Sequence, residues 1–169
     1  MSDHRYQTLG ARFVAGIIDS IVALPFFLVL TLVDMPSLVA WLVETLMVLV
    51  NLAYFVILHG RDGQTIGKKV MKVRVVGADT ETRISYRQSL QRESPLIAIN
   101  LIYFIVEVVL FASESGREPA LLIAVYVAIQ RLPNYWWIAD AVTALFNPKR
   151  RSIHDFIGGT IVVNEGLAS

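Results

Sequence analysis

The chain has 169 residues, of which 55% are hydrophobic and only 17% are charged, and its mean hydropathy is +0.57. Soluble domains carry about 25% charged residues, so we predict one integral membrane domain over residues 1–169. The net charge of +1 argues against a nucleic-acid partner, and the absence of cysteine excludes disulfides, thiolate metal sites and thiol catalysis.

Two apolar segments, about 13–33 and 37–59, open the chain and are joined by a short turn at Asp34–Pro36. Each is close to the ~20 residues that a helix needs to cross the hydrocarbon core of a bilayer. The first is longer than the apolar core of a signal peptide, which has ~7–15 residues, so we expect a retained helix. The short turn predicts that the two helices are antiparallel neighbours.

Two further apolar segments, about 96–112 and 120–146, complete the prediction of an all-α membrane protein with four transmembrane helices. The last segment is longer than one straight span requires, and it contains Pro133. Proline removes a backbone donor inside a helix, so the sequence predicts a kink or a break there. Either one kinked helix crosses the membrane, or an outer-surface helix leads into a shorter span from Asn134.

Lysine and arginine are concentrated on one side of the predicted membrane. They lie in the loop 60–94 and the tail 147–169, whereas the opposite links carry only Arg117. The positive-inside rule therefore places both termini, the loop and the tail in the cytoplasm, beneath what we expect to be a bacterial inner membrane. The loop should also meet anionic lipids of the inner leaflet. Its basic residues are Arg61, Lys68, Lys69, Lys72, Arg74, Arg83, Arg87 and Arg92.

The cytoplasmic loop and tail are predicted to be structured. Charge alternation predicts a short strand at 73–76, and a β-branched run predicts another at 160–163, so we expect the two to pair in a small sheet. Ser85 and Gln88 have the spacing of a capping box at the start of a helix. We expect that helix to lie on the inner leaflet.

Three local motifs, in this order along the chain, resemble the RDD family of bacterial membrane proteins. The resemblance covers nearly the whole sequence. It implies that the arginine and the two aspartates characteristic of the family are Arg12, Asp19 and Asp155. The motifs are ARFVAGIID at 11–19, GQTIGKKVMKVRVV at 63–76 and RSIHDFIGGTIVV at 151–163.

The resemblance implies a charged cluster at the cytoplasmic surface and two functional classes. Some members have been linked to sodium/proton antiport, and eukaryotic relatives are accessory subunits of a larger membrane complex. Asn147 departs from the pattern, because family members often carry an aspartate there. The implied cluster is Arg12, Asp19, Arg74, Arg92 and Asp155, and the motif glycines are Gly63, Gly67 and Gly159.

Arg12 and Asp19 are seven residues apart, so they share one face of a helix and lie about 10 Å apart along its axis. In one interpretation, Asp19 carries a proton or cation and Arg12 adjusts its pKa. In the other, which we favour, Asp19 pairs with an arginine of the cytoplasmic loop and locks the first helix to that loop.

Polar residues within the apolar segments are predicted to lie in layers. Glu44 and Glu107 would lie on the outer side, Asn51 near the middle, and Asp19 and Asp140 on the inner side. A proton or cation relay requires such layers. The alternative is structural, with acids near the interface reaching water and Asn51 bonding neighbouring helices.

The segment 63–69 does not match a phosphate-binding loop, because three residues rather than four separate Gly63 from Gly67 and its lysine. We interpret it as a tight turn at the membrane surface, where glycines allow positive φ and close backbone approach. The histidines lack metal-ligand spacing, and no serine-nucleophile motif is present. We therefore predict no enzymatic activity, no metal site and no cofactor.

Together these features predict a small transporter, with proton-coupled exchange of a monovalent cation as the concrete form. Asp19 and Asp140 would carry the ion on the inner side, and Glu44 and Glu107 would lie at the outer mouth. Four helices seldom enclose a complete pathway, so transport would require a homo-oligomer. The alternative is a non-catalytic scaffold or accessory subunit that docks on a membrane-protein partner.

Overall fold

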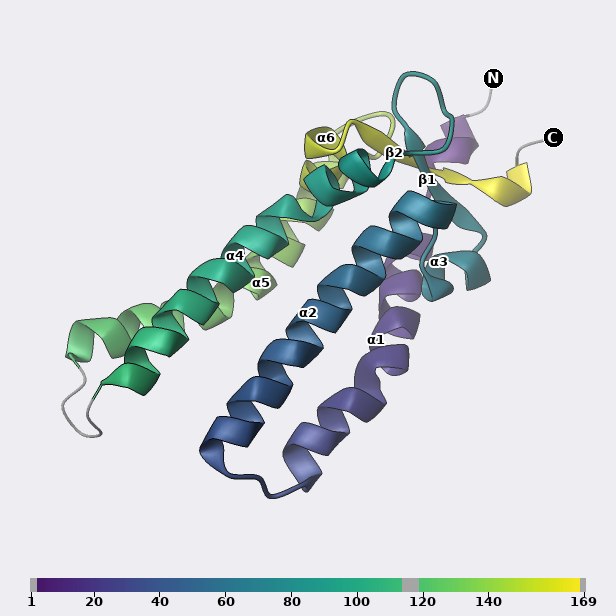
Figure 1. Cartoon of the computed structure of the whole chain (residues 1–169). Helices are drawn as coiled ribbons and strands as arrows, with labels where there is room; N and C mark the ends of the chain where they lie inside the picture. Colours follow the sequence, from purple (N-terminus) through teal and green to yellow (C-terminus); the bar gives the residue numbers. More distant parts are fainter. Residues whose placement is uncertain (1–2, 114–118, 168–169) are drawn as a thin grey trace.

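The structure is a computed structural model that describes residues 3–113 and 119–167. Long helices dominate it, and the shorter elements gather at the end where both termini lie (Figure 1). The long helices are α1 (Leu9–Leu32), α2 (Ser37–Asp62), α4 (Tyr86–Ala112) and α5 (Ala120–Leu145). The short elements are η1 (Asp3–Tyr6), α3 (Ile66–Val70), β1 (Val73–Gly77), α6 (Ile153–Ile157), β2 (Thr160–Asn164) and η2 (Glu165–Leu167).

Three helices of the described chain are long and apolar enough to cross a membrane. The candidate spans are His4–Leu28, Ser37–Asp62 and Tyr86–Ala112. α5 has 26 residues but is not among the three. The molecule is therefore mostly helical, with three candidate membrane spans and a fourth long helix.

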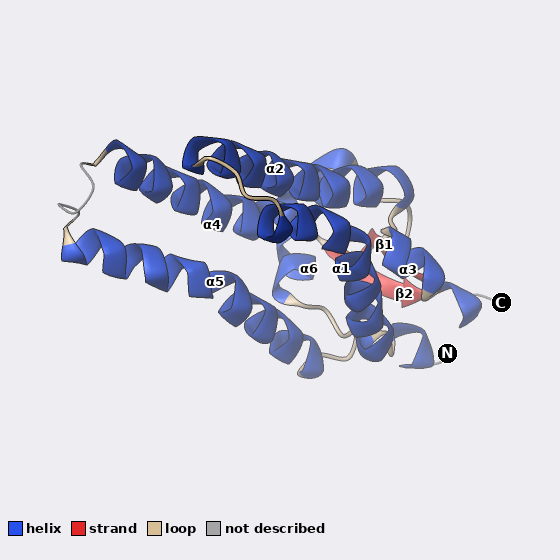
Figure 2. Cartoon of the chain, turned by 90° about the horizontal axis from the view of Figure 1, so that it is seen from below, coloured by secondary structure: helices blue, strands red, loops and turns tan. Residues whose placement is uncertain are grey.

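The long helices form two hairpins, α1–α2 and α4–α5, that meet along α2 and α4 (Figure 2). α2 packs mainly on α4, and α4 packs on α5. α1 packs mainly on α3, so the N-terminal helix is held by the short elements more than by its own hairpin partner. The interface between α2 and α4 is thus the central helix contact of the molecule.

The third span begins ten residues earlier than the predicted boundary at 96. The expected surface helix does not exist as a separate element, because α4 runs continuously from Tyr86 to Ala112 through Pro95. Its start is the predicted capping box, in which Ser85 and Gln88 each bond the other's backbone. Pro95 cannot donate to the carbonyl of Gln91, and the Ser94 hydroxyl donates to that carbonyl instead at 2.7 Å.

The fourth long helix is a single element. α5 continues through Pro133 to Leu145, so the alternative of two separate helices is wrong. The polar link before it contains Arg117, whose predicted place on the outer side lies outside the described residues.

The predicted pairing of 73–76 with 160–163 is confirmed. β1 and β2 are antiparallel, with Val73 opposite Asn164 and Gly77 opposite Thr160. Because side chains alternate along a strand, each face of this small sheet has its own core. Val73, Val75 and Val162 pack with Ile84 on one face, and the other core is made by Val76, Ala78, Ile161 and Val163.

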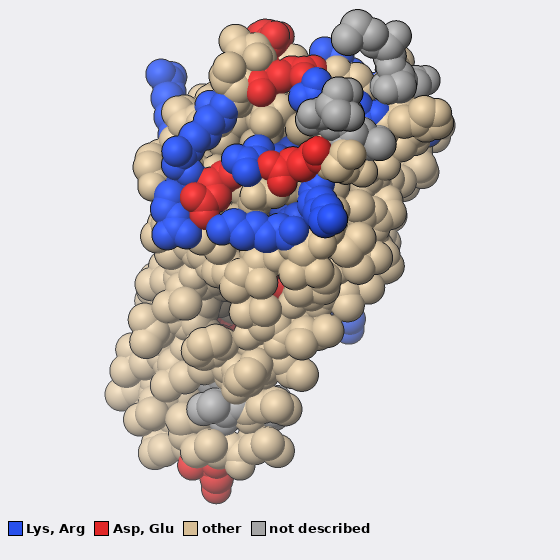
Figure 3. Space-filling view, turned by 90° about the vertical axis from the view of Figure 1, so that its right-hand side faces the viewer, with Lys and Arg blue, Asp and Glu red and all other residues tan. Residues whose placement is uncertain are grey.

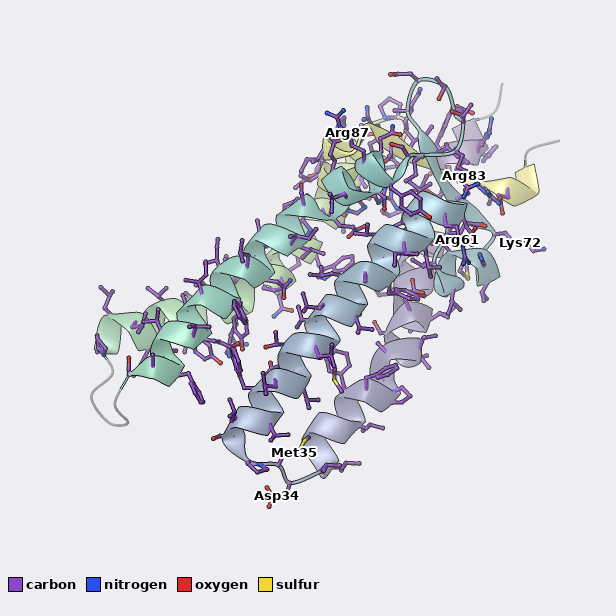
Figure 4. The ribbon with its side chains drawn as sticks, in the orientation of Figure 1. Asp34, Met35, Arg61, Lys72, Arg83 and Arg87 are labelled. Carbon is purple, nitrogen blue, oxygen red and sulfur yellow. The ribbon has the colours of Figure 1, made fainter. Side chains whose placement is uncertain are left out.

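Charged side chains are distributed unevenly along the long axis of the molecule. Lysine and arginine gather around the sheet end, and a broad surface below them is almost free of charge (Figure 3). Arg61, Lys72, Arg83 and Arg87 lie at that end, whereas Asp34 lies at the opposite tip between α1 and α2 (Figure 4). We refer to α3, β1, α6, β2 and the loops around them as the cap.

Candidate functional site

Asp155 is the centre of the charged cluster. It lies in α6, is completely buried, and accepts hydrogen bonds from Arg12 of α1 and Arg92 of α4. Ser152 begins α6 in a capping box and donates to the same carboxylate from its backbone nitrogen at 3.1 Å and its hydroxyl at 2.9 Å. One carboxylate therefore joins two long helices to the cap, and the sequence motif predicted this meeting of Arg12, Arg92 and Asp155.

The negative charge of Asp155 is compensated by two arginine side chains, which make further hydrogen bonds of their own. Burial would raise the pKa of Asp155, but the guanidinium groups of Arg12 and Arg92 hold it well below its usual range. Arg12 also donates to the carbonyl of Arg150 at 2.8 Å, and Arg92 donates to the Thr160 hydroxyl at 2.9 Å. A carboxylate so surrounded stays ionised, which suits a structural clamp better than a proton carrier.

His154 extends the cluster to α5. Its Nδ1 lies 2.7 Å from Asp140 Oδ2, and its backbone nitrogen donates to Asp140 Oδ1 at 3.0 Å. Arg92 lies against Nε2, so the hydrogen-bond pattern assigns the ring proton to Nδ1. Burial and the charge of Arg92 lower the pKa of His154, against the opposite effects of Asp155 and Asp140. The inner acid Asp140 is thus joined to the cap through a neutral imidazole.

Asp19 belongs to a separate group, and its predicted arginine partner is wrong. Within the described chain, its carboxylate accepts hydrogen bonds from the Thr65 hydroxyl at 2.6 Å, the Gly67 backbone nitrogen at 2.8 Å and the Tyr54 hydroxyl at 2.8 Å. Arg12, which acts on Asp19 in the interpretation that we did not favour, binds Asp155 in the structure. The predicted locking of the first helix to the loop does occur, through these neutral donors.

The glycines of the second motif explain why the loop can approach α1. A Cβ on Gly67 would overlap the backbone carbonyl of Ala15, so only glycine fits this contact. Gly63 ends α2 with φ +70°, a conformation that favours glycine. Gly159, directly before β2, also has a positive φ, of +61°. The interpretation of the glycines as turn and close-approach positions is confirmed.

Arg74 lies apart from the other cluster residues. It binds Glu165 after β2, and its Nη2 donates to Gln64 Oε1 at 3.2 Å. Gln64 Nε2 in turn donates to Glu165 at 2.9 Å. The predicted single cluster is therefore three groups, centred on Asp155, on Asp19 and on Glu165.

A cavity of about 370 Å³ lies between α2 and α4, in the half of the helices far from the cap. Glu44 and Glu107 both line it, as their similar predicted depth suggested. Asn51 is exposed and does not line the cavity, whereas Asn100 of α4 does. The amide at the middle of this cavity is therefore that of Asn100.

Glu107 is held in place by aromatic side chains. Its carboxylate accepts hydrogen bonds from Trp41 Nε1 at 3.2 Å and from the Tyr126 hydroxyl at 3.3 Å. Tyr126 also stacks on Tyr103 with ring centroids 5.4 Å apart. Glu107 thus connects α2, α4 and α5 inside the apolar part of the molecule.

The sequence analysis missed a buried pair at the inner end of the same helix interface. His59 of α2 is 2% exposed, and its Nδ1 lies 3.2 Å from Glu93 of α4, outside hydrogen-bond geometry. Glu93, Asn100 and Glu107 are spaced by seven residues, which places them on one face of a helix. That spacing was visible in the sequence, but the predicted loop extended through Glu93 and hid it.

In the described residues, no group of histidine and acidic side chains is arranged to hold a metal ion. The chemistry that the molecule offers is ionic: a clamp of fixed charges at the cap, and two carboxylates facing a cavity between helices. A carboxylate within an apolar segment can bind a proton or a cation.

Comparison with known proteins matches the sequence to one family. The family model described as "RDD family" matches residues 6–159. An "uncharacterized membrane protein YteJ" of Bacillus subtilis (strain 168) is 28% identical over 175 residues, covering 97% of this chain and 84% of the relative. No solved structure matches the chain.

Proposed function

The chain belongs to the RDD family of membrane proteins, and from the interface of α2 and α4 we propose that it is a small transporter that exchanges a monovalent cation for protons. The observation that carries this proposal is the cavity faced by Glu44 and Glu107. Ionisable residues within membrane segments are costly and usually mark ion or substrate pathways.

The depth of the two acids supports their role as carriers. Glu44 is seven residues from the start of α2, and Glu107 is five residues from the end of α4, so each lies about 8–10 Å from a helix end. In the described chain, Glu44 receives no hydrogen bond from a protein group, and no basic side chain pairs with it. A carboxylate in this position can therefore exchange partners.

The inner side of the route follows α2 and α4 in this proposal. Ile97 lines the cavity and lies four residues after Glu93, about 6 Å along the helix. Asp19 and Asp140 are bound by the cap, so we assign them to holding the cap and not to carrying the ion. In this proposal, the buried pair of His59 and Glu93 provides the next polar groups along the route after the cavity.

We also propose four membrane spans, with α5 as the fourth and the cap in the cytoplasm of a bacterial inner membrane. The gathering of lysine and arginine around the cap supports this orientation, and the same side chains would contact anionic lipids (Figure 3). The even number of spans agrees with both termini lying beside the cap (Figure 1). A homo-oligomer would enclose the open side of the helix array.

Single-cysteine labelling tests the orientation directly, because the chain has no native cysteine. Asp34→Cys at the α1–α2 tip and Asp79→Cys in the cap are both exposed positions. In intact cells, a membrane-impermeant maleimide should label Asp34→Cys and spare Asp79→Cys. The reverse pattern would overturn the proposed orientation.

A flux assay in proteoliposomes tests the function. Internal pH is followed as sodium, potassium or lithium is added outside, for the wild type, Glu107→Gln and Glu44→Gln. Asp79→Asn, which changes an exposed acid of the cap, is the matched control. We expect cation-dependent proton flux that falls at least tenfold in the cavity variants and is unchanged in the control. Absence of flux with any of these ions and with organic cations, in folded wild type, would refute transport.

The contacts of the charged residues in the family motifs favour a second function, that of a scaffold or accessory subunit. Arg12, Arg92 and Asp155 join helices to the cap, as a scaffold requires. Tyr135 and Trp137 on α5 are 65% and 55% exposed and offer aromatic contacts to a partner from different sides of the helix. In an accessory subunit, substitution of the cavity acids would leave function intact, whereas substitution of these aromatics would release a partner in a pull-down from membranes.

A further inference from the structure

The cavity between α2 and α4 has the size and lining of a site for a small organic molecule. Its volume of about 370 Å³ lies within the ~300–1,000 Å³ typical of such sites. Val48, Leu52 and Ile97 contribute to apolar walls, and the polar groups are few. A bare alkali ion gains nothing from apolar walls, whereas an organic ion buries its carbon surface against them.

Aromatic rings surround the acids of this cavity. Tyr103 and Phe104 of α4 line it, and Trp41 stacks on Phe104 with ring centroids 5.5 Å apart. Aromatic faces attract cations, and the attraction strengthens where water is excluded. Aromatic walls beside two carboxylates therefore favour a ligand that is both apolar and positively charged.

The cavity opens toward the bilayer. Among its lining residues, Leu49 is 58% exposed and Leu101 is 57% exposed, on the apolar surface that lipid would cover. A ligand that partitions into the membrane can reach such an opening from the side. This access route matches an amphipathic ligand better than one confined to water.

We propose that the transported cation is an amphipathic organic monocation that enters this cavity from the bilayer. The proposal rests on the transport function proposed above, and it names the substrate class of the same site. Glu44 and Glu107 supply the negative charge, and the aromatic rings contact the apolar body of the cation.

Exchange follows from charge balance in the cavity. As the cation enters, one carboxyl group of Glu44 or Glu107 releases its proton to water, so the net charge of the occupied cavity stays the same. When the cation leaves, a proton returns to that carboxylate. Tyr103 and Tyr126 also lie at the site, where their hydroxyls are hydrogen-bonded to each other and the Tyr126 hydroxyl donates to Glu107.

Binding of tetraphenylphosphonium to the purified full chain in lipid nanodiscs tests the inference without a flux measurement. Tetraphenylborate, an anion of the same shape, controls for partition into lipid. We expect saturable binding of the cation alone, weakening as pH falls, and at least tenfold weaker binding in Glu107→Gln and Glu44→Gln. Asp79→Asn should bind as the wild type does.

Some outcomes would overturn the inference. Equal binding of the two probes, or unchanged binding in both acid variants, would show that apolar partition or a lipid tail accounts for occupancy. Among residues 3–113 and 119–167, no group donates a hydrogen bond to Glu44, so Glu44→Gln keeps the test valid if Glu107→Gln fails to fold. Sodium-driven proton flux without phosphonium binding would overturn this inference and leave the proposed function standing. Phosphonium binding with no proton exchange would support the site and refute exchange.

Discussion

Neutralising Asp155 should loosen the cap from the long helices. In Asp155→Asn, Arg12 and Arg92 would lose their shared anion, and the Arg92 side chain is 2% exposed. Removing one partner of a buried ion pair costs about 3–5 kcal/mol. An asparagine amide must also turn a donor toward one of the two guanidinium groups, so it cannot restore both contacts. The loss should be local at first, because the helices keep their own backbone hydrogen bonds.

Amide hydrogen exchange of β1 and β2 in detergent or nanodiscs measures this effect. A loss of 3–5 kcal/mol corresponds to exchange faster by about 10²- to 10³-fold or more, if the cap opens as a unit. Asp79→Asn removes an exposed acid from the same cap and should change exchange by less than about twofold. A second substitution, Arg92→Gln, should cost less in the Asp155→Asn background than alone. An effect of Asp155→Asn no larger than that of Asp79→Asn would refute the clamp.

Three further outcomes are expected. Gly67→Ala should lower the free energy of unfolding by about 1–3 kcal/mol, because its Cβ would overlap the Ala15 carbonyl, whereas Gly16→Ala has open space and should be neutral or stabilising in thermal unfolding. Burial and nearby Arg92 lower the pKa of Lys68 to about 8, so its ¹³C-methyl NMR signal after reductive methylation should titrate near that pH, and a midpoint near 10 would contradict this. The pKa of His154 is lowered on folding, so as pH falls below the unfolded value of about 6.5 the unfolded chain binds the extra proton and stability decreases. His154→Gln should flatten that dependence between pH 7 and 5, and an unchanged slope would exclude His154 as its source.

Local features of the chain were predictable because they depend on neighbours in the sequence. The capping box at Ser85 depends on a residue three positions later, and the turn at Gly63 depends on one backbone conformation. The pairing of the two strands also followed from their composition, because each is apolar and short and neither can remain unpaired in a folded cap.

Other predictions failed because distant contacts decide them. The boundary of α4 was placed too late, since the hydroxyl of Ser94 replaces the bond that Pro95 removes. The partner of Asp19 was taken to be an arginine, but the loop brings backbone and hydroxyl donors to it first. Asn51 and Asn100 are both intramembrane amides, and only helix packing determines which one faces the cavity.

The sequence by itself determined the membrane class, the family and the identity of the charged residues, because hydropathy, motif order and charge are properties of the linear chain. Only the tertiary structure decided which charges meet. Asp155 binds Arg12 and Arg92, which are eighty residues apart in the sequence, and Glu44 and Glu107 share a cavity because α2 packs on α4. These pairings depend on helix rotation and loop path, which are set by packing over the whole molecule.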